Sequence, residues 1–480
     1  MSLLSKEEMR RFLLFLKSPY CNKSEVMVSL FGYLRGFYPD FKAEKIKKEN
    51  TYKRLKDEVV TDANRTKARK YVNDRISDLT VLLEEFLVMQ SIINNPEKKA
   101  ELLREKFLKL RENDFFLKAN AQAIDTLDKK TILSGEEQLA LWKLKYEPFL
   151  HPQFNHLSAK NSDISDTMPD LDTAYAIFKL RYEVHRLCHR RILKSKDEKL
   201  PLLEGIVATF SDTDNVVIRI YLEILSCFEN EAIARWKKTV AEVVRHFPEL
   251  PFEEKLVMLT ALINLGYRLA QGISRGMFLE IFQLYRLGSD DGLWTHGGII
   301  SRITFMNIVI MGTTTIGGLK PNEVREQLRW IELFIEKARD YLPENNRRNT
   351  IILARAQLAF AKRDFERTCS LLQEVKLSEL PDKLQFRVLQ AKCLYELNRQ
   401  YPVNEERLLN FLNAFYRFIK EKPLAEEKKQ AYINFIKMLR NLSDGNRTPQ
   451  RRKRLRRRLT NKEGMVARDW LGEKLSEYDA

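Results

Sequence analysis

A strongly basic run near the C-terminal end holds the residues whose type and spacing most clearly suit chemistry. Seven of the eight residues from 451 to 458 are positively charged, namely Arg451, Arg452, Lys453, Arg454, Arg456, Arg457 and Arg458. Guanidinium groups bind phosphate oxygens in pairs, and each phosphate contact releases a counterion. Leu455 and Leu459 are four residues apart, so "RRKRLRRRL" predicts a basic helix with a narrow apolar seam.

Two interpretations of this run remain open. One is contact with the backbone of nucleic acid, independent of base sequence, because the run lacks the aromatic residues that stack on bases and matches no known DNA-reading motif. The other is a solvated segment, or a clasp on an acidic surface of the same chain. A second basic region, Lys42–Arg75, holds 12 Lys and Arg against 6 Asp and Glu and would share the first role.

The sequence "HRLCH" is the best candidate for a metal site. It places His185, Cys188 and His189 on one face of a helix, and these are side chains that zinc accepts as ligands. Three arginines flank the motif and would repel a cation, and no fourth ligand is apparent. We therefore expect an ordinary helix surface here and no metal.

Two further motifs match functional loops only in part. "GTTTIGGLK" (Gly312–Lys320) has the glycines of a phosphate loop, but Gly318 and Leu319 stand where that loop needs Lys and then Ser or Thr. "SDTDN" (Ser211–Asn215) has alternating acids, but it lacks the glycine and the closing glutamate of a calcium loop. The sequence predicts an inter-helix turn at the first motif and a helix cap at the second.

No catalytic constellation is evident in the chain. Gly-x-Ser-x-Gly, His-Glu-x-x-His and Cys-x-x-Cys are all missing. Catalytic triads assemble in space, so this absence lowers the expectation of catalysis without removing it. We expect no enzyme and no cofactor, with an unrecognised enzyme as the second alternative.

Composition indicates a folded, helix-rich protein. Apolar residues make up 44% of the 480 residues and charged residues 31%, which excludes wholesale disorder. Only 17 Gly and 15 Pro are present, fewer than the many turns of a β-rich protein would require. The formal net charge is +17, and the eight Lys and Arg between Arg447 and Arg458 supply less than half of it, so the whole chain would attract anions.

Cysteine usage and apolar runs bear on location. The five cysteines are widely spaced, which indicates reduced thiols, and "MSLLSKEEMRRF" has no apolar run of signal-peptide length. The uncharged segment "ITFMNIVIMGTTTIGGL" is 17 residues long, contains Asn307 and ends in Thr and Gly. A membrane-spanning helix needs about 20 mostly apolar residues, so we expect a buried helix, no membrane span and a cytoplasmic protein.

Signals for the starts and ends of helices divide the chain into four predicted parts. Residues 1–150 form an N-terminal helical region, in which Ser5 and Glu8 have capping-box spacing. Residues 151–172, rich in Ser, Asp, Asn and Pro, read as a linker. Residues 173–445 are predicted to be repeated helices, most clearly at 321–420, and 446–480 hold the basic segment and a last helix.

The clearest internal pattern is a repeat of small and aromatic residues. Ala391 lies 35 residues after Ala356, and Tyr395 lies 35 residues after Phe360. Asp364 and Phe365 stand at the turn of "ILARAQLAFAKRDFERTCSLLQEVKLSELP". Small residues let paired helices approach closely, and aromatics fill the space beside them. One pair cannot bury its apolar face alone, so pairs stack.

This pattern resembles the tetratricopeptide family over about 100 residues. The period is 35 rather than the family's 34, Thr368 replaces a usual alanine, and the repeat tryptophan is missing. The segments "FLKSPYCNKSEVMVSLFGYL" and "CLYELNR" are also similar to a group of large uncharacterised bacterial proteins. The resemblance implies an all-α fold, an α–α superhelix of stacked helix pairs, and no particular activity.

The function that this fold suggests is binding. The first hypothesis is a non-enzymatic scaffold or adaptor that holds a protein or peptide in the concave groove of the repeats. The second is a sequence-independent RNA- or DNA-associated protein that uses the basic segments. The sequence does not indicate which polar residues would face the groove.

Overall fold

The computed structural model describes residues 4–39, 41, 46–150, 163–193, 200–270, 275–375, 380–401, 405–444, 448–460 and 464–479. Every regular element in these ranges is a helix, and none of these residues forms a strand. The all-α prediction is confirmed. Among the same residues, no helix combines the length and apolarity that crossing a bilayer requires.

Contacts divide the chain into two compact units. Unit 1 comprises Met1–Lys129 with Lys143–Ile164, and unit 2 comprises Lys130–Trp142 with Ser165–Ala480. The chain therefore passes between the units more than once, whereas the sequence suggested one boundary at 151–172. Of that predicted linker, 151–162 lie outside the described residues. The rest contains the 3-10 helix η2 and the start of α9.

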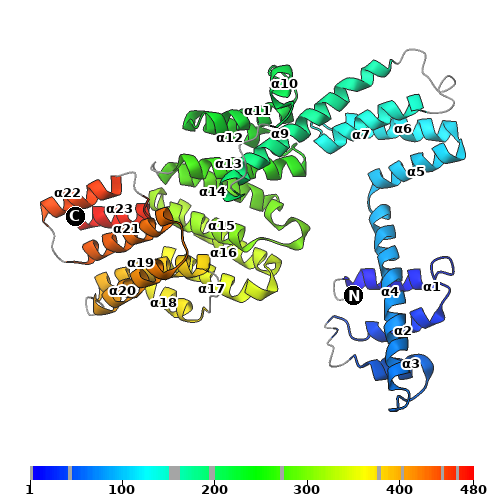
Figure 1. Cartoon of the computed structure of the whole chain (residues 1–480), viewed down its shortest axis with the longest axis horizontal. Coiled ribbons are helices and arrows are strands. Elements are labelled where there is room, and N and C mark those ends of the chain that lie inside the picture. The colour runs from blue at the N-terminus through cyan, green and yellow to red at the C-terminus, as the bar shows by residue number, and fades with distance from the viewer. Residues whose placement is uncertain are drawn as a thin grey trace. The chain divides into compact units, whose positions relative to one another are not determined.

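The helices of unit 1 (Figure 1) are α1 (Lys6–Lys17), α2 (Glu25–Arg35), α3 (Lys48–Lys56), α4 (Arg65–Ile93), α5 (Pro96–Leu110), α6 (Asn113–Asp128) and the 3-10 helix η1 (Glu147–Leu150). The predicted capping box is present at α1, where Ser5 and Glu8 bond reciprocally. Phe12, Phe31 and Phe86 form an aromatic core, with ring centroids 4.9 and 5.2 Å from that of Phe12. This core joins α1 and α2 to α4.

Helix α7 (Gly135–Tyr146) begins in unit 2 because its first turn packs there. A Cβ on Gly135 would come within 2.9 Å of the Phe178 ring, so only glycine permits this approach. The Gly135 N–H donates to Glu254 at 3.4 Å, and Arg181 forms an ion pair with Glu254 at 3.3 Å. Tyr221 also donates to Glu254, whose side chain is completely buried. Burial raises the pKa of Glu254, and these partners oppose that rise.

The remaining helices of unit 2 are α9 (Met168–Leu193), α10 (Leu203–Thr209), α11 (Val216–Glu229), α12 (Ile233–His246), α13 (Phe252–Leu269), α14 (Arg275–Asp290), α15 (Arg302–Thr314), α16 (Pro321–Ala338), α17 (Glu344–Ala361), α18 (Phe365–Gln373), α19 (Leu380–Gln400), α20 (Glu405–Glu421), α21 (Glu426–Ser443), α22 (Pro449–Thr460) and α23 (Arg468–Asp479). The 3-10 helices η2 (Ile164–Thr167), η3 (Leu293–Gly298), η4 (Thr315–Gly318) and η5 (Arg339–Tyr341) lie between them. One apolar core runs from α9 to α19, and a second joins α19, α20, α21, α22 and α23.

The repeat-signature residues lie where helices meet. Ala356 on α17 and Ala391 on α19 are completely buried, and Tyr395 on α19 is 3% exposed. The Asp364 side chain caps α18 by accepting from the N–H of Arg367 at 3.1 Å. Phe360 and the buried Phe365 place their ring centroids 5.4 Å apart across this turn. These residues therefore shape the contacts between successive helices.

Candidate nucleic-acid interface

The predicted basic helix is present as α22, and Figure 1 shows it beside α23. Pro449 is its first residue, a position where the missing N–H costs nothing. Leu455 is 2% exposed, and Leu459 packs against the same core as Leu471 and Leu475 of α23. The predicted apolar seam therefore attaches α22 to the C-terminal core.

Burial of the seam fixes the directions in which the seven basic side chains point. Five of them are exposed, namely Lys453, Arg454, Arg456, Arg457 and Arg458, and we call these the cationic face. Successive residues are 100° apart around a helix axis, so Lys453 and Arg457, each two residues from Leu455, lie almost opposite it. The helix thus presents an ordered array of positive charge, where a flexible tail would hold none of these charges in place.

The remaining two basic residues, Arg451 and Arg452, are only partly exposed. Arg451 Nη2 lies 2.8 Å from Asp444 Oδ2 and donates to Asn441 Oδ1 at 3.2 Å. The hypothesis of a clasp on the same chain therefore describes Arg451, which ties α22 back to α21. Asp444 is the only acid between Lys428 and Arg458 in the sequence, whereas α23, which packs against α22, brings Asp469, Glu473 and Glu477 beside Leu459.

Helix α23 holds α22 in place and is itself anchored to the repeat. Lys474 Nζ lies 2.7 Å from Glu396 Oε1 on α19, and both side chains are almost completely buried. The signature residue Tyr395 packs edge-on against Trp470 of α23, with ring centroids 5.5 Å apart. Lys392 Nζ lies 5.4 Å from the Trp470 centroid, and burial lowers the pKa of Lys392 to about 8.

A second cluster of cations lies over aromatic rings of α20. The Tyr416 ring has Lys420 Nζ at 5.1 Å and Arg440 Cζ at 5.9 Å from its centroid. The Phe418 ring has Arg387 Cζ at 4.3 Å and Lys422 Nζ at 5.3 Å. No motif in the sequence indicated this group. The i, i+4 spacing of Tyr416 and Lys420 was a signal, but the arginines come from other helices.

Arg440 of α21 links α20 to α22 only indirectly. Its Nη2 donates to Asn413 Oδ1 on α20 at 2.6 Å, and its neighbour Asn441 accepts from Arg451 of α22. The rings of Tyr416 and Phe418 already have cations of this chain over them, so they are not part of the cationic face.

A surface cavity of about 680 Å³ adjoins Leu459 and is lined mainly by α23. Asp469, Glu473 and Glu477 line it together with Arg468. This mixture of charges does not favour a phosphate, so the cavity is not part of the proposed interface.

The second basic region belongs to unit 1. Lys42 and Lys45 lie outside the described residues. Of the rest, Arg69 pairs with Glu49 at 3.2 Å, and Lys56 lies 5.0 Å from the Tyr71 centroid. Seven exposed basic residues take part in no ion pair that the structure shows, namely Lys47, Lys48, Lys53, Arg54, Lys56, Lys67 and Lys70. This region shows no basic array on a single helix face comparable to that of α22.

The residues of the weaker motifs have structural partners. His185 and His189 are exposed on α9, with ring centroids 5.5 Å apart, and burial raises the pKa of Cys188 to about 11. No group of three His, Cys, Asp or Glu residues arranged for a metal occurs among the described residues. Asn215 caps α11, as predicted, by accepting from the N–H of Ile218 at 3.1 Å.

The "GTTTIGGLK" motif joins α15 to α16, as predicted. A Cβ on Gly312 would meet Phe282 at 2.6 Å and Ile331 at 2.7 Å. The Gly312 carbonyl accepts from Gln327 at 2.6 Å. The first glycine of this motif is therefore required for helix packing.

Comparison of the chain with protein-family models, with curated proteins and with solved structures found no match in any of the three.

Proposed function

We propose that this chain is a non-enzymatic helical-repeat protein that binds the phosphate backbone of nucleic acid through the cationic face of α22. The observation that supports the proposal is the burial of Leu455, which directs five basic side chains away from the core. An ordered array loses less conformational entropy on binding than a flexible tail does. Binding is expected to be independent of base sequence, because the array contains Arg and Lys but no amide side chain aimed at base edges.

The proposal includes the architecture that carries this helix. We propose that the helix pairs of unit 2 stack as a tetratricopeptide-like α–α superhelix in the cytoplasm. The burial of Ala356 and Ala391 at successive helix contacts supports the stacking. An experimental structure of the full chain would test it, and helices packed as a closed bundle would contradict it.

The experiment is a salt titration of binding to a fluorescent single-stranded RNA and a duplex DNA. The test variant changes Lys453, Arg454, Arg456, Arg457 and Arg458 to Gln. The control variant changes Lys48, Lys53, Arg54, Lys67 and Lys70 to Gln and so removes the same charge from unit 1. Each lost phosphate contact should flatten the slope of log affinity against log salt by about one unit.

The expected result is a steep slope for the wild type and the control, and a slope several units flatter for the test variant. If the slope flattens equally in both variants, net charge alone accounts for the binding, and this result would contradict a defined interface on α22. Absence of binding at physiological salt would reject the proposed function.

A protein-binding scaffold is the second candidate, and exposed apolar side chains in unit 1 favour it. On α4, α5 and α6, five are more than half exposed, namely Val81, Val88, Ile93, Leu110 and Phe115. Val81 and Val88 are seven residues apart on α4 and so share one face of that helix. This candidate predicts that a discrete protein partner copurifies with the chain. Its binding should survive nuclease treatment, should be lost when Val81 and Val88 are changed to Ser, and should be retained by the α22 variant.

A further inference from the structure

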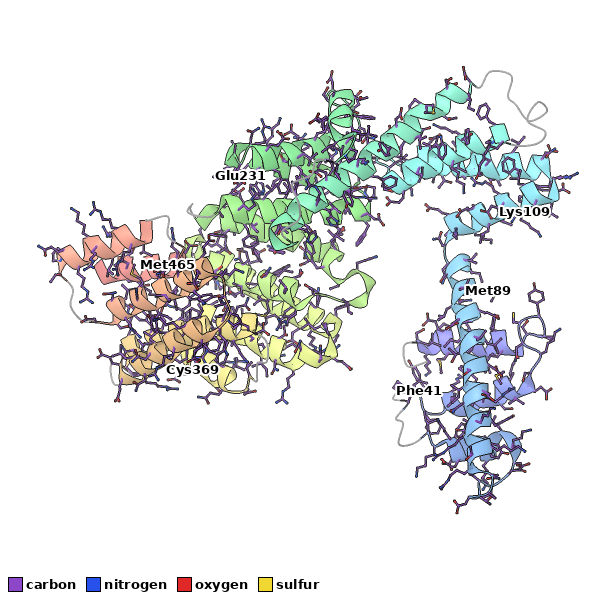
Figure 2. The ribbon with its side chains drawn as sticks, viewed as in Figure 1. Phe41, Met89, Lys109, Glu231, Cys369 and Met465 are labelled. Carbon is purple, nitrogen blue, oxygen red and sulfur yellow. The ribbon has the colours of Figure 1, made fainter. Side chains whose placement is uncertain are left out.

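Two cysteines that are distant in the sequence meet in the repeat. Cys369 lies on α18, where Figure 2 labels it, and Cys393 lies on α19. Their Sγ atoms are 3.0 Å apart, about 1 Å farther than in a disulfide bond of about 2.05 Å. This pair could not be predicted from the sequence, because 24 residues separate its members and no Cys-x-x-Cys motif is present.

The two thiols have unequal surroundings. Cys393 is completely buried, and its Sγ lies 3.0 Å from the carbonyl oxygen of Phe365, which accepts the Cys393 S–H when that proton is not donated to Cys369. Cys369 is partly exposed. A hydrogen bond from the Cys393 thiol lowers the pKa of Cys369, and the positive charge of Arg407 on α20 lowers it further. The same contact raises the pKa of Cys393, as does its burial.

This inequality separates an attacking thiol from a resolving one. A redox-sensitive cysteine needs thiolate character, access to the oxidant and a second thiol in reach. Cys369 meets the first two requirements, and Cys393 meets the third. The rings of Phe360 and Phe365 and the side chain of Leu397 enclose Cys393, so an oxidant reaches Cys369 first.

We propose that Cys369 and Cys393 form a redox modification site, at which a peroxide converts the two thiols reversibly into a disulfide that joins α18 to α19. The site is independent of the proposed interface on α22, and its test does not involve nucleic acid.

The chemistry balances in two steps. The Cys369 thiolate attacks one oxygen of hydrogen peroxide, the O–O bond breaks, and Cys369 sulfenic acid and hydroxide form. The Cys393 sulfur then attacks the Cys369 sulfur, the S–O bond breaks, and that oxygen leaves as water after taking up a proton. Overall, two thiols lose two electrons and two protons, and one peroxide becomes two waters. Two equivalents of a thiol such as glutathione reverse the bond by exchange.

The experiment uses the full-length reduced protein and hydrogen peroxide in small molar excess. After free thiols are alkylated, trypsin should separate Cys369, on peptide 368–376, from Cys393, on peptide 393–399. The expected result is a cross-linked pair of these peptides, lighter by two hydrogen atoms than the sum of the reduced peptides. Dithiothreitol should restore both thiols.

Single variants test the order of the two steps. Cys393→Ser should leave a sulfenic acid on Cys369 that dimedone traps, and Cys369→Ser should leave Cys393 unmodified. Cys21→Ser is the control and should form the cross-link as the wild type does. If Cys393→Ser fails to fold, the peptide map of the wild-type protein still shows whether peroxide links Cys369 to Cys393. Peroxide treatment that leaves both peptides alkylated, or links either cysteine to a different one, would overturn the proposal.

Discussion

Lys474 of α23 and Glu396 of α19 form an ion pair, with Nζ and Oε1 2.7 Å apart, and 5% and 7% of their side chains are exposed. Both charges have left water, so each depends on the other and on its remaining hydrogen bonds. Lys474 has a second partner in Glu477, at 2.9 Å, on its own helix. This pair holds the C-terminal helix, and with it α22, against the repeat.

Removing one member of this pair should be far more damaging than removing both. Lys474→Met leaves Glu396 buried without its partner and should lower the free energy of unfolding by about 3–5 kcal/mol. The double variant Lys474→Met with Glu396→Leu should recover most of that loss. Urea unfolding of the four proteins in the cycle gives the coupling energy, and additive losses would show that the pair is not a unit.

The buried Lys392 should give the protein an unusual pH dependence. Its pKa is lowered from 10.5 to about 8, a difference worth about 3 kcal/mol. Between pH 8 and 10.5 the unfolded chain binds this proton and the folded chain does not, so stability from this group rises with pH. Below pH 8 both states are protonated and the penalty is complete.

Lys392→Met isolates this effect, because the variant lacks the titrating group. Urea midpoints of the variant and the wild type should differ most at pH 7, with the variant more stable, and should converge toward pH 10. A difference that stays constant across this range would contradict the assignment to Lys392.

The apolar seam of α22 should matter for binding although it carries no charge. Leu455→Ala removes a buried side chain, a loss of about 2–5 kcal/mol in well-packed sites, and should detach α22 from the C-terminal core. The ordered array would then be lost, and RNA affinity should fall several-fold at constant net charge. Leu409→Ala, at a side chain that is 37% exposed, is the matched control. Equal affinity in all three proteins would mean that a flexible basic segment suffices.

Glycine-to-alanine substitutions should distinguish a glycine that close helix packing requires from one that only adds backbone flexibility. Gly312→Ala places a Cβ within 2.6 Å of Phe282 and should cost about 1–3 kcal/mol. Gly205→Ala, in α10, meets nothing within 4 Å and should stabilise by about 0.4–1 kcal/mol. Thermal unfolding of both variants is the measurement, and a neutral Gly312→Ala would show that α15 can shift away from α14.

Local signals in the sequence predicted the elements well. The four-residue spacing of Leu455 and Leu459 predicted both the helix and its buried side, because neighbours on a helix face are set by local geometry alone. The capping box at Ser5 and the cap at Asn215 are equally local. All three features are present in the structure.

Pairings between distant residues could not be predicted in the same way. Glu396 with Lys474, Cys369 with Cys393, and Tyr416 with Arg440 each join two helices whose relative positions depend on the packing of many others. The close packing of Gly135 against the Phe178 ring is a further example, because the two residues come from different helices. No periodicity within one segment carries this information.

The charges that make α22 a candidate binding surface also act against the helix itself. Arg452 and Arg456, Lys453 and Arg457, and Arg454 and Arg458 are like-charged pairs at i, i+4, each of which destabilises a helix by about 0.2–0.5 kcal/mol. Burial of the leucine seam must overcome this self-repulsion. A polyanion bound to the cationic face would neutralise these pairs and so stabilise the helix that presents them.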